Sequence, residues 1–116
     1  MTRGAGITQT LGAESCVSKL ALFFPEASAI RFPVQVVVAR PGGKNISEAT
    51  VIEFGTAAEA LFPSNLPLEF DDRVRILQGN GDLLAEATVV AVQYHDGRKA
   101  VAVRFRSNPR RWMIKS

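Results

Sequence analysis

A chain of 116 residues is long enough to enclose one hydrophobic core but too short for two domains of ordinary size. Hydrophobic residues make up 47% and charged residues 22%, which excludes a fibrous chain or one disordered throughout. The net charge of +3 is unevenly spread: residues 1–96 carry seven basic and eleven acidic residues, whereas residues 97–116 carry seven basic residues and no acid. Such a one-signed segment attracts anions, so a binding role is favoured over catalysis.

Residues 1–27 are predicted to be an N-terminal lead-in, partly mobile, because Gly, Thr, Ala and Ser dominate its beginning without periodicity. Within it, Val17–Phe24 is apolar enough to pack, either as a short helix or as a strand, and periodicity does not decide between them. Three side chains could form the packed side: Leu20, Phe23 and Phe24. Pro25 ends the segment in either case.

The sequence also predicts a cytoplasmic location. Cys16 is the only cysteine, so an internal disulfide is excluded, and we expect a reduced, incidental thiol. Charged and polar residues interrupt the apolar run that a signal peptide needs, namely Glu14, Ser15, Ser18 and Lys19. The apolar run is also far shorter than the ~20 residues of a membrane span.

From residue 31 onward the pattern is typical of β-strands. Phe32–Ala39 is β-branched and apolar, with Val34, Val36 and Val38 on one face. Pro41-Gly42-Gly43 breaks the chain, and Glu48–Phe54 resumes a strand pattern. Gly55–Phe62 is ambiguous, because its alanines suit a helical turn while a second short strand is equally compatible.

The second half predicts three strands joined by two tight turns. Arg73–Leu77 alternates, with Val74 and Ile76 inward, and Ala85–Tyr94 and Lys99–Arg106 are the next two strands. On the last of these, Val101, Val103 and Phe105 share one face and Arg104 and Arg106 the other. Asn80-Gly81 and Asp96-Gly97 are both residue pairs that favour a type I′ hairpin turn.

About six short strands with one apolar face close best into a small barrel, since closure removes the exposed edges. The predicted fold is therefore all-β: a small antiparallel six-stranded barrel with short helical or irregular additions at both ends. The barrel domain covers residues 28–116, including a basic C-terminal extension that follows Pro109.

In order and spacing, residues 28–106 resemble a PilZ domain. The segments that carry the resemblance are Arg31-Phe32-Pro33-Val34, Thr50 to Gly55, Leu66-Pro67-Leu68, Asp72 to Ile76 and the strand ending Val103-Arg104-Phe105. Members of that family are six-stranded barrels that commonly bind cyclic di-GMP, a bacterial second messenger. The resemblance implies a signalling protein without enzymatic activity or a cofactor, with cyclic di-GMP as a possible ligand.

The ligand motifs of that family are only partly present. Arg31 matches the second arginine of an R-x-x-x-R pair, but Ala27 occupies the first position. In place of D/N-x-S-x-x-G the chain has Glu53, Gly55 and Ala58. Each lost hydrogen bond to a charged group is worth roughly 1–3 kcal/mol, so affinity should fall by several orders of magnitude. We predict weak or absent cyclic di-GMP binding, with Arg31, Glu53 and Gly55 as a remnant site. In the structural alternative none of the three binds a ligand: Arg31 is a charged residue at the start of a strand, Glu53 is a solvated strand end and Gly55 is a turn residue.

The basic C-terminus is the other candidate site. Phosphate binding and base stacking would use Arg104, Arg106, Arg110, Arg111, Trp112 and Lys115. In the alternative interpretation the arginines form a solubilising face, Arg104 and Arg106 pair with outward acids such as Glu86, and Trp112 closes the end of the barrel. The cluster leaves two functions open: a basic surface for a protein partner, or a nucleic-acid-binding barrel.

No residue is assigned a catalytic or metal-binding role. His95 and Asp96 are neighbours on a hairpin tip, where we expect their side chains to point apart into solvent. Asp71, Asp72 and Asp82 lack the spacing of a calcium loop. The leading hypothesis is a PilZ-like adaptor that acts by contacting another protein, through the loop around Arg31 and Glu53 and through the basic C-terminal face.

Overall fold

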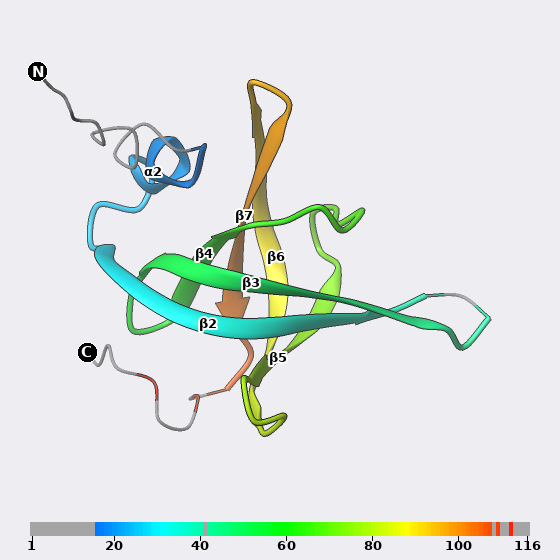
Figure 1. Cartoon of the computed structure of the whole chain (residues 1–116). Helices are drawn as coiled ribbons and strands as arrows, with labels where there is room; N and C mark the ends of the chain where they lie inside the picture. The colour runs from blue at the N-terminus through cyan, green and yellow to red at the C-terminus, as the bar shows by residue number, and fades with distance from the viewer. Residues whose placement is uncertain (1–15, 41, 108, 110–111, 113–116) are drawn as a thin grey trace, which may run out of the picture.

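The computed structural model describes residues 16–40, 42–107, 109 and 112, which form one short helix and six strands (Figure 1). In chain order the elements are α2 (Cys16–Ala21), β2 (Ser28–Ala39), β3 (Asn45–Gly55), β4 (Glu59–Pro63), β5 (Arg73–Gln78), β6 (Leu83–His95) and β7 (Arg98–Phe105). The ambiguous segment after Gly55 is therefore a strand, preceded by a three-residue turn. The predicted contribution of Arg110, Arg111 and Lys115 lies outside the described residues.

The six strands close into a barrel in the order β2-β3-β4-β7-β6-β5, with β2 paired to β5. All neighbouring strands are antiparallel. The predicted all-β fold, a small antiparallel six-stranded barrel, is confirmed. Its longest hairpin, formed by β2 and β3, extends beyond the other strands (Figure 1).

Alternation of side chains along each strand builds the barrel core. Val34, Val36 and Val38 of β2 are at most 3% exposed and point inward, as their spacing predicts. The alternate residues of the other strands join them, including Val74, Ile76, Val101, Val103 and Phe105. Because the intervening residues of β5 and the end of β7 are arginines, these stretches of the outer surface are positively charged.

The two predicted tight turns differ from each other. Asp96 and Gly97 both have positive φ, 52° and 76°, as a type I′ turn between His95 and Arg98 requires. At the other turn only Gly81 has positive φ, and the Gln78 N–H bonds to the Asp82 carbonyl across three intervening residues. The type I′ prediction at Asn80-Gly81 is wrong because the loop is one residue longer and needs a single left-handed glycine.

α2 packs against the outside of the barrel, over β4 and β7. Val17 and Leu20, one turn apart, are buried with Leu61, Ala100 and Ala102. Backbone bonds from Leu22, Phe23 and Phe24 to the carbonyls three residues earlier tighten the end of the helix, and Pro25 stops it. Of the three side chains expected to pack, Leu20 is buried and Phe24 partly buried, but Phe23 is 71% exposed, so that part of the prediction is wrong.

Trp112 closes one end of the barrel. Its ring is 3% exposed and lies 5.6 Å from Phe32 and 5.1 Å, edge to face, from Phe105. Its indole N–H donates to the Thr56 carbonyl at 2.8 Å. The tryptophan is therefore a core residue with a satisfied polar group, which is the structural alternative drawn from the sequence.

Candidate functional site

The two segments predicted to form a remnant ligand site lie on neighbouring strands at the same end of the barrel. Ala29 pairs with Phe54 and Phe32 with Ile52, so Ile30 and Arg31 together face the single residue Glu53. This β-bulge places exposed Arg31 opposite half-buried Glu53, while Gly55 pairs with Ser28. The register therefore brings Arg31 close to Glu53 and Gly55, which lie more than twenty residues later in the sequence.

The position of the missing arginine is part of a turn. Ala27, four residues before Arg31, donates its backbone N–H to the Phe24 carbonyl at 2.8 Å. A methyl side chain at this position offers no donor to a phosphate or a guanine. The cationic contribution of this segment is therefore limited to Arg31.

The turn after β3 satisfies its own polar groups. The Thr56 hydroxyl accepts the backbone N–H groups of Ala58 and Glu59, at 3.1 and 3.0 Å, and donates to Glu59 Oε1 at 3.0 Å. The Thr56 carbonyl is already bonded to Trp112. A Thr-x-x-Glu spacing is the sequence signal for this reciprocal arrangement, which here closes a strand-to-strand turn instead of a helix.

Arg104 lies beside this turn and is paired. Its Nη2 and Nε both donate to Glu59 Oε2, at 2.7 and 3.2 Å. β4 and β7 place Glu59 directly opposite Arg104, so the outward acid that matches this arginine is Glu59, whereas the sequence analysis named Glu86. The register was needed to find this partner, because Glu59 lies forty-five residues away in sequence.

A groove of about 310 Å³ opens next to this pair. Phe23, Phe24, Pro25 and Glu26 form one wall, and the other comes from Thr56, Glu59 and Arg104. Leu22 and Phe23 are 80% and 71% exposed at this edge of the molecule. The sequence analysis missed this apolar rim, because an apolar run that ends a helix is expected to be buried.

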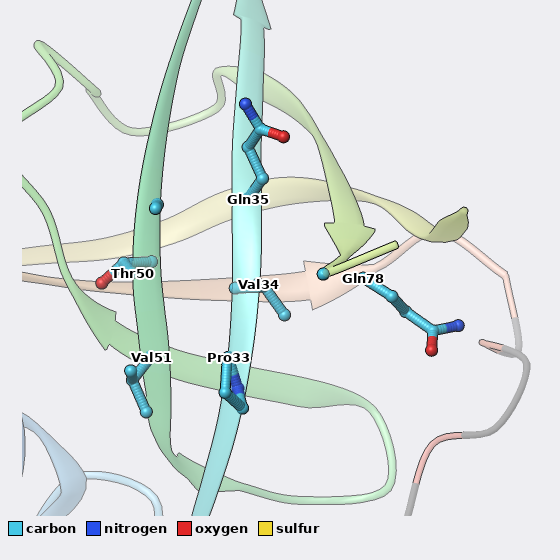
Figure 2. Close-up of a pocket in the computed structure, with 8 residues that line it drawn as sticks. Pro33, Val34, Gln35, Thr50, Val51 and Gln78 are labelled. Carbon is cyan, nitrogen blue, oxygen red and sulfur yellow. The ribbon is translucent and has the colours of Figure 1, made fainter. Parts of the chain in front are cut away.

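A second cavity, of about 510 Å³, lies between β2, β3 and the end of β5 (Figure 2). The side chains labelled there include Gln35, Thr50 and Gln78, and the described residues of its lining carry no titratable group. Gln35 Nε2 donates to Ser47 Oγ at 3.2 Å, and Thr50 Oγ1 donates to the Pro63 carbonyl at 2.7 Å. This cavity offers hydrogen bonds but no charge or nucleophile.

The isolated titratable residues have structural surroundings. Burial, and then the negative charge of Glu53, raise the pKa of the Cys16 thiol, which favours its neutral form. His95 Nε2 lies 3.3 Å from Asp96 Oδ2 at the hairpin tip, so the expectation that these side chains point apart is wrong. Asp72 accepts the Glu69 N–H and lies 3.6 Å from Arg40, while Asp82 lies on a different turn.

The described residues form neither a cluster of metal ligands nor a helix that could span a membrane. Among residues 16–40, 42–107, 109 and 112, no group of three or more His, Cys, Asp or Glu side chains is arranged to hold a metal ion. In the same part of the chain, no helix has the length and hydropathy needed to cross a bilayer.

The fold defines a PilZ-like β-barrel, as the resemblance implied. A solved structure of the inhibitor of motility from Bacillus subtilis, MotI/DgrA, is similar, with a TM-score of 0.55 and 11% sequence identity. The match covers 72% of this chain and 42% of that one, so this chain spans less than half the length of its structural neighbour. At this identity the likeness shows the fold alone. No family model matches the sequence, and no curated protein matches it.

Proposed function

We propose that this chain is a non-enzymatic, PilZ-like signalling or adaptor domain that acts in the cytoplasm by contacting another protein and binds cyclic di-GMP weakly or not at all. One observation carries the proposal. At the end of the barrel where Arg31 faces Glu53, the neighbouring Arg104 is already paired with Glu59, and the turn after β3 is closed by its own hydrogen bonds. Among the described residues a dinucleotide would find one arginine there without a salt bridge, Arg31, and guanine and phosphate recognition depends on several.

A protein contact is supported by the surface beside the same turn. Leu22 and Phe23 expose large apolar side chains next to the groove that Arg104 and Glu59 border. Exposed apolar patches on a protein surface often mark interaction sites, and a few large side chains supply most of the affinity of a protein interface. The structural neighbour is named as an inhibitor of motility, and a regulatory role of that kind is compatible with an adaptor.

Calorimetry with cyclic di-GMP tests the ligand half of the proposal. The unmodified chain should give no measurable heat at micromolar concentrations, because several charge-assisted hydrogen bonds are missing. Ala27→Arg should raise the affinity, and Arg98→Ala, at an exposed arginine on another strand, should not change it. Micromolar binding by the unmodified chain that Arg31→Ala abolishes would overturn the proposal.

Partner capture tests the other half. Phe23→Asp should weaken capture of a specific cellular protein by the tagged chain. Phe70→Asp is the matched control, because Phe70 is 73% exposed and lies on the β4–β5 connection. Equal capture by both variants contradicts a contact through the Phe23 surface.

The alternative function is a nucleic-acid-binding barrel. Its aromatic stacking residue was to be Trp112, but this ring is buried against Phe32 and Phe105 and its N–H is bonded. The acidic body would further repel a long polyanion. A gel-shift titration across salt concentrations tests this alternative, since binding to nucleic acid weakens steeply as salt rises.

A further inference from the structure

A third groove, of about 310 Å³, lies on the outer surface of the barrel across β2, β5 and β6. Arginines from different parts of the sequence converge there: the groove is lined by Val37, Ala39, Asn45, Arg73, Val74, Arg75, Glu86 and Arg106. Arg106 was predicted as a binding residue because it lies in the basic C-terminus, whereas no binding role was predicted for Arg73 or Arg75.

Strand register fixes the order of the charges. Arg75 pairs with Val37 of β2 on one side and with Glu86 of β6 on the other. The Arg106 backbone N–H donates to the Glu86 carbonyl at 2.8 Å, so Glu86 lies between the two arginines. Arg73 is on the same face as Arg75, two residues earlier, and pairs with Thr88.

None of these three arginines forms a salt bridge with a described residue, although Glu86 lies between Arg75 and Arg106. Within the described ranges the salt bridges are Arg40 with Asp72, His95 with Asp96 and Arg104 with Glu59, and none of them involves the groove. Arg73, Arg75 and Arg106 are all exposed, and Glu86 is the only acid among the groove residues. The groove therefore carries an excess of positive charge beside the outward apolar side chains of Val37 and Ala39.

We infer that this groove binds an extended acidic segment of a partner protein, in which carboxylates alternate with apolar residues. The inference rests on the proposed function in one respect: the partner is a protein. β5 and the end of β7 are two strand spacings apart, roughly 10 Å, and alternate side chains of an extended peptide are about 7 Å apart. Separate carboxylates on flexible side chains can thus reach Arg75 and Arg106 individually.

Glu86 determines which anions fit. A compact phosphate held between Arg75 and Arg106 would lie against the Glu86 carboxylate, and like charges at that distance repel. A nucleic-acid backbone, with a charge on every phosphate, meets the same repulsion along its length. A peptide can instead place a backbone N–H or a neutral side chain opposite Glu86, and its apolar residues can cover Val37 and Ala39.

Fluorescence anisotropy with the full chain tests the inference. The probe is a short fluorescein-labelled peptide in which glutamates alternate with valines, and the control peptide has glutamine in place of each glutamate. We expect the acidic peptide to bind and the glutamine control peptide not to bind. The affinity of the acidic peptide should fall about tenfold or more in an Arg75→Ala, Arg106→Ala double variant. Arg98→Ala, which removes an exposed arginine outside the groove, should leave the affinity unchanged.

A second arm uses inorganic pyrophosphate and a single-stranded oligonucleotide as competitors. Both should displace the peptide poorly from the unmodified chain and better from Glu86→Gln. Failure of the acidic peptide to bind, equal binding of the glutamine peptide, an unchanged affinity in the double variant, or tighter binding of the oligonucleotide would each overturn the inference. Tight cyclic di-GMP binding through Arg31 would overturn the proposed function but would not change the outcome of the peptide-binding experiment.

Discussion

Arg104 and Arg106 lie two residues apart at the end of the last strand, yet their surroundings are opposite. Arg104 faces Glu59 on β4, and both nitrogens on one edge of its guanidinium donate to one carboxylate oxygen. Arg106 joins Arg73 and Arg75 around a groove with one acid, and no described carboxylate forms a salt bridge with it. We call the groove beside α2 the closed groove, because its arginine is paired with a carboxylate. The groove over β5 is the open groove, because its described arginines outnumber its acid.

The difference teaches that a charge count does not locate a binding surface. The C-terminal twenty residues look uniformly basic in sequence, but strand pairing neutralises one arginine and leaves the next for a ligand. The open groove also gathers two arginines from a stretch whose net charge is negative. Further variants break or sharpen this comparison, beyond the binding experiments given above.

Trp112→Ala should have the largest effect, because it opens the closed end of the barrel. Removing a buried tryptophan leaves a cavity, and we expect the free energy of unfolding to fall by about 3–5 kcal/mol. Urea denaturation followed by circular dichroism measures this value. Trp112→Phe should cost less, since a ring remains to pack on Phe32 and Phe105 while the Thr56 carbonyl loses its donor.

Arg106→Ala is the control for the tryptophan variant, because Arg106 is exposed at the open groove and forms no salt bridge with a described residue. Its free energy of unfolding should stay within about 0.5 kcal/mol of the unmodified chain. An equal loss of stability in the Trp112→Ala and Arg106→Ala variants would contradict the contrast between a buried core residue and an exposed groove residue.

Glu59→Gln should lower the free energy of unfolding by less than Trp112→Ala does. It should also leave Arg104 without a paired carboxylate, as the arginines of the open groove are. Gln can still accept the Thr56 hydroxyl, so the variant mainly removes the charge opposite Arg104. Because Arg104 is 58% exposed, the pair should contribute only about 0.2–1 kcal/mol. A double-mutant cycle of Glu59→Gln with Arg104→Gln, measured by urea denaturation, gives the coupling energy. A coupling of zero would show that this pair does not distinguish the grooves energetically.

Cys16 provides the smallest effect and extends the comparison to the outward face beneath α2. Its pKa is raised by burial and by the charge of Glu53, so alkylation by iodoacetamide near pH 9 should be slower in the folded chain than in urea. Because the pKa of Cys16 is higher in the folded chain than in the unfolded chain, the neutral thiol contributes to the free energy of unfolding. This contribution is complete below the unfolded pKa and is lost as pH rises through the folded pKa. Glu53→Gln should speed alkylation; an unchanged rate would contradict the influence of that charge.

Local patterns in the sequence were sufficient for much of the fold. Val34, Val36 and Val38 could be assigned inward because the side-chain period of a strand is two, and Asp96-Gly97 specified its turn because few residue pairs tolerate positive φ twice. The type I′ turn predicted at Asn80-Gly81 was wrong, because the pairing of β5 and β6 sets the loop length. The loop length in turn decides which residue adopts a positive φ. Phe23 failed because its exposure depends on where α2 meets the barrel.

The sequence by itself determined the β class, the inward faces of the strands and the absence, at Ala27, of the first arginine of the R-x-x-x-R motif, since each depends on residue type and short-range spacing. Only the tertiary structure decided that Glu59 matches Arg104, that Trp112 is a core residue, and that Arg73, Arg75 and Arg106 share one groove. The physical reason is that a closed barrel brings residues together by strand order and register. A single sequence without these pairings holds no signal for contacts separated by thirty or more residues.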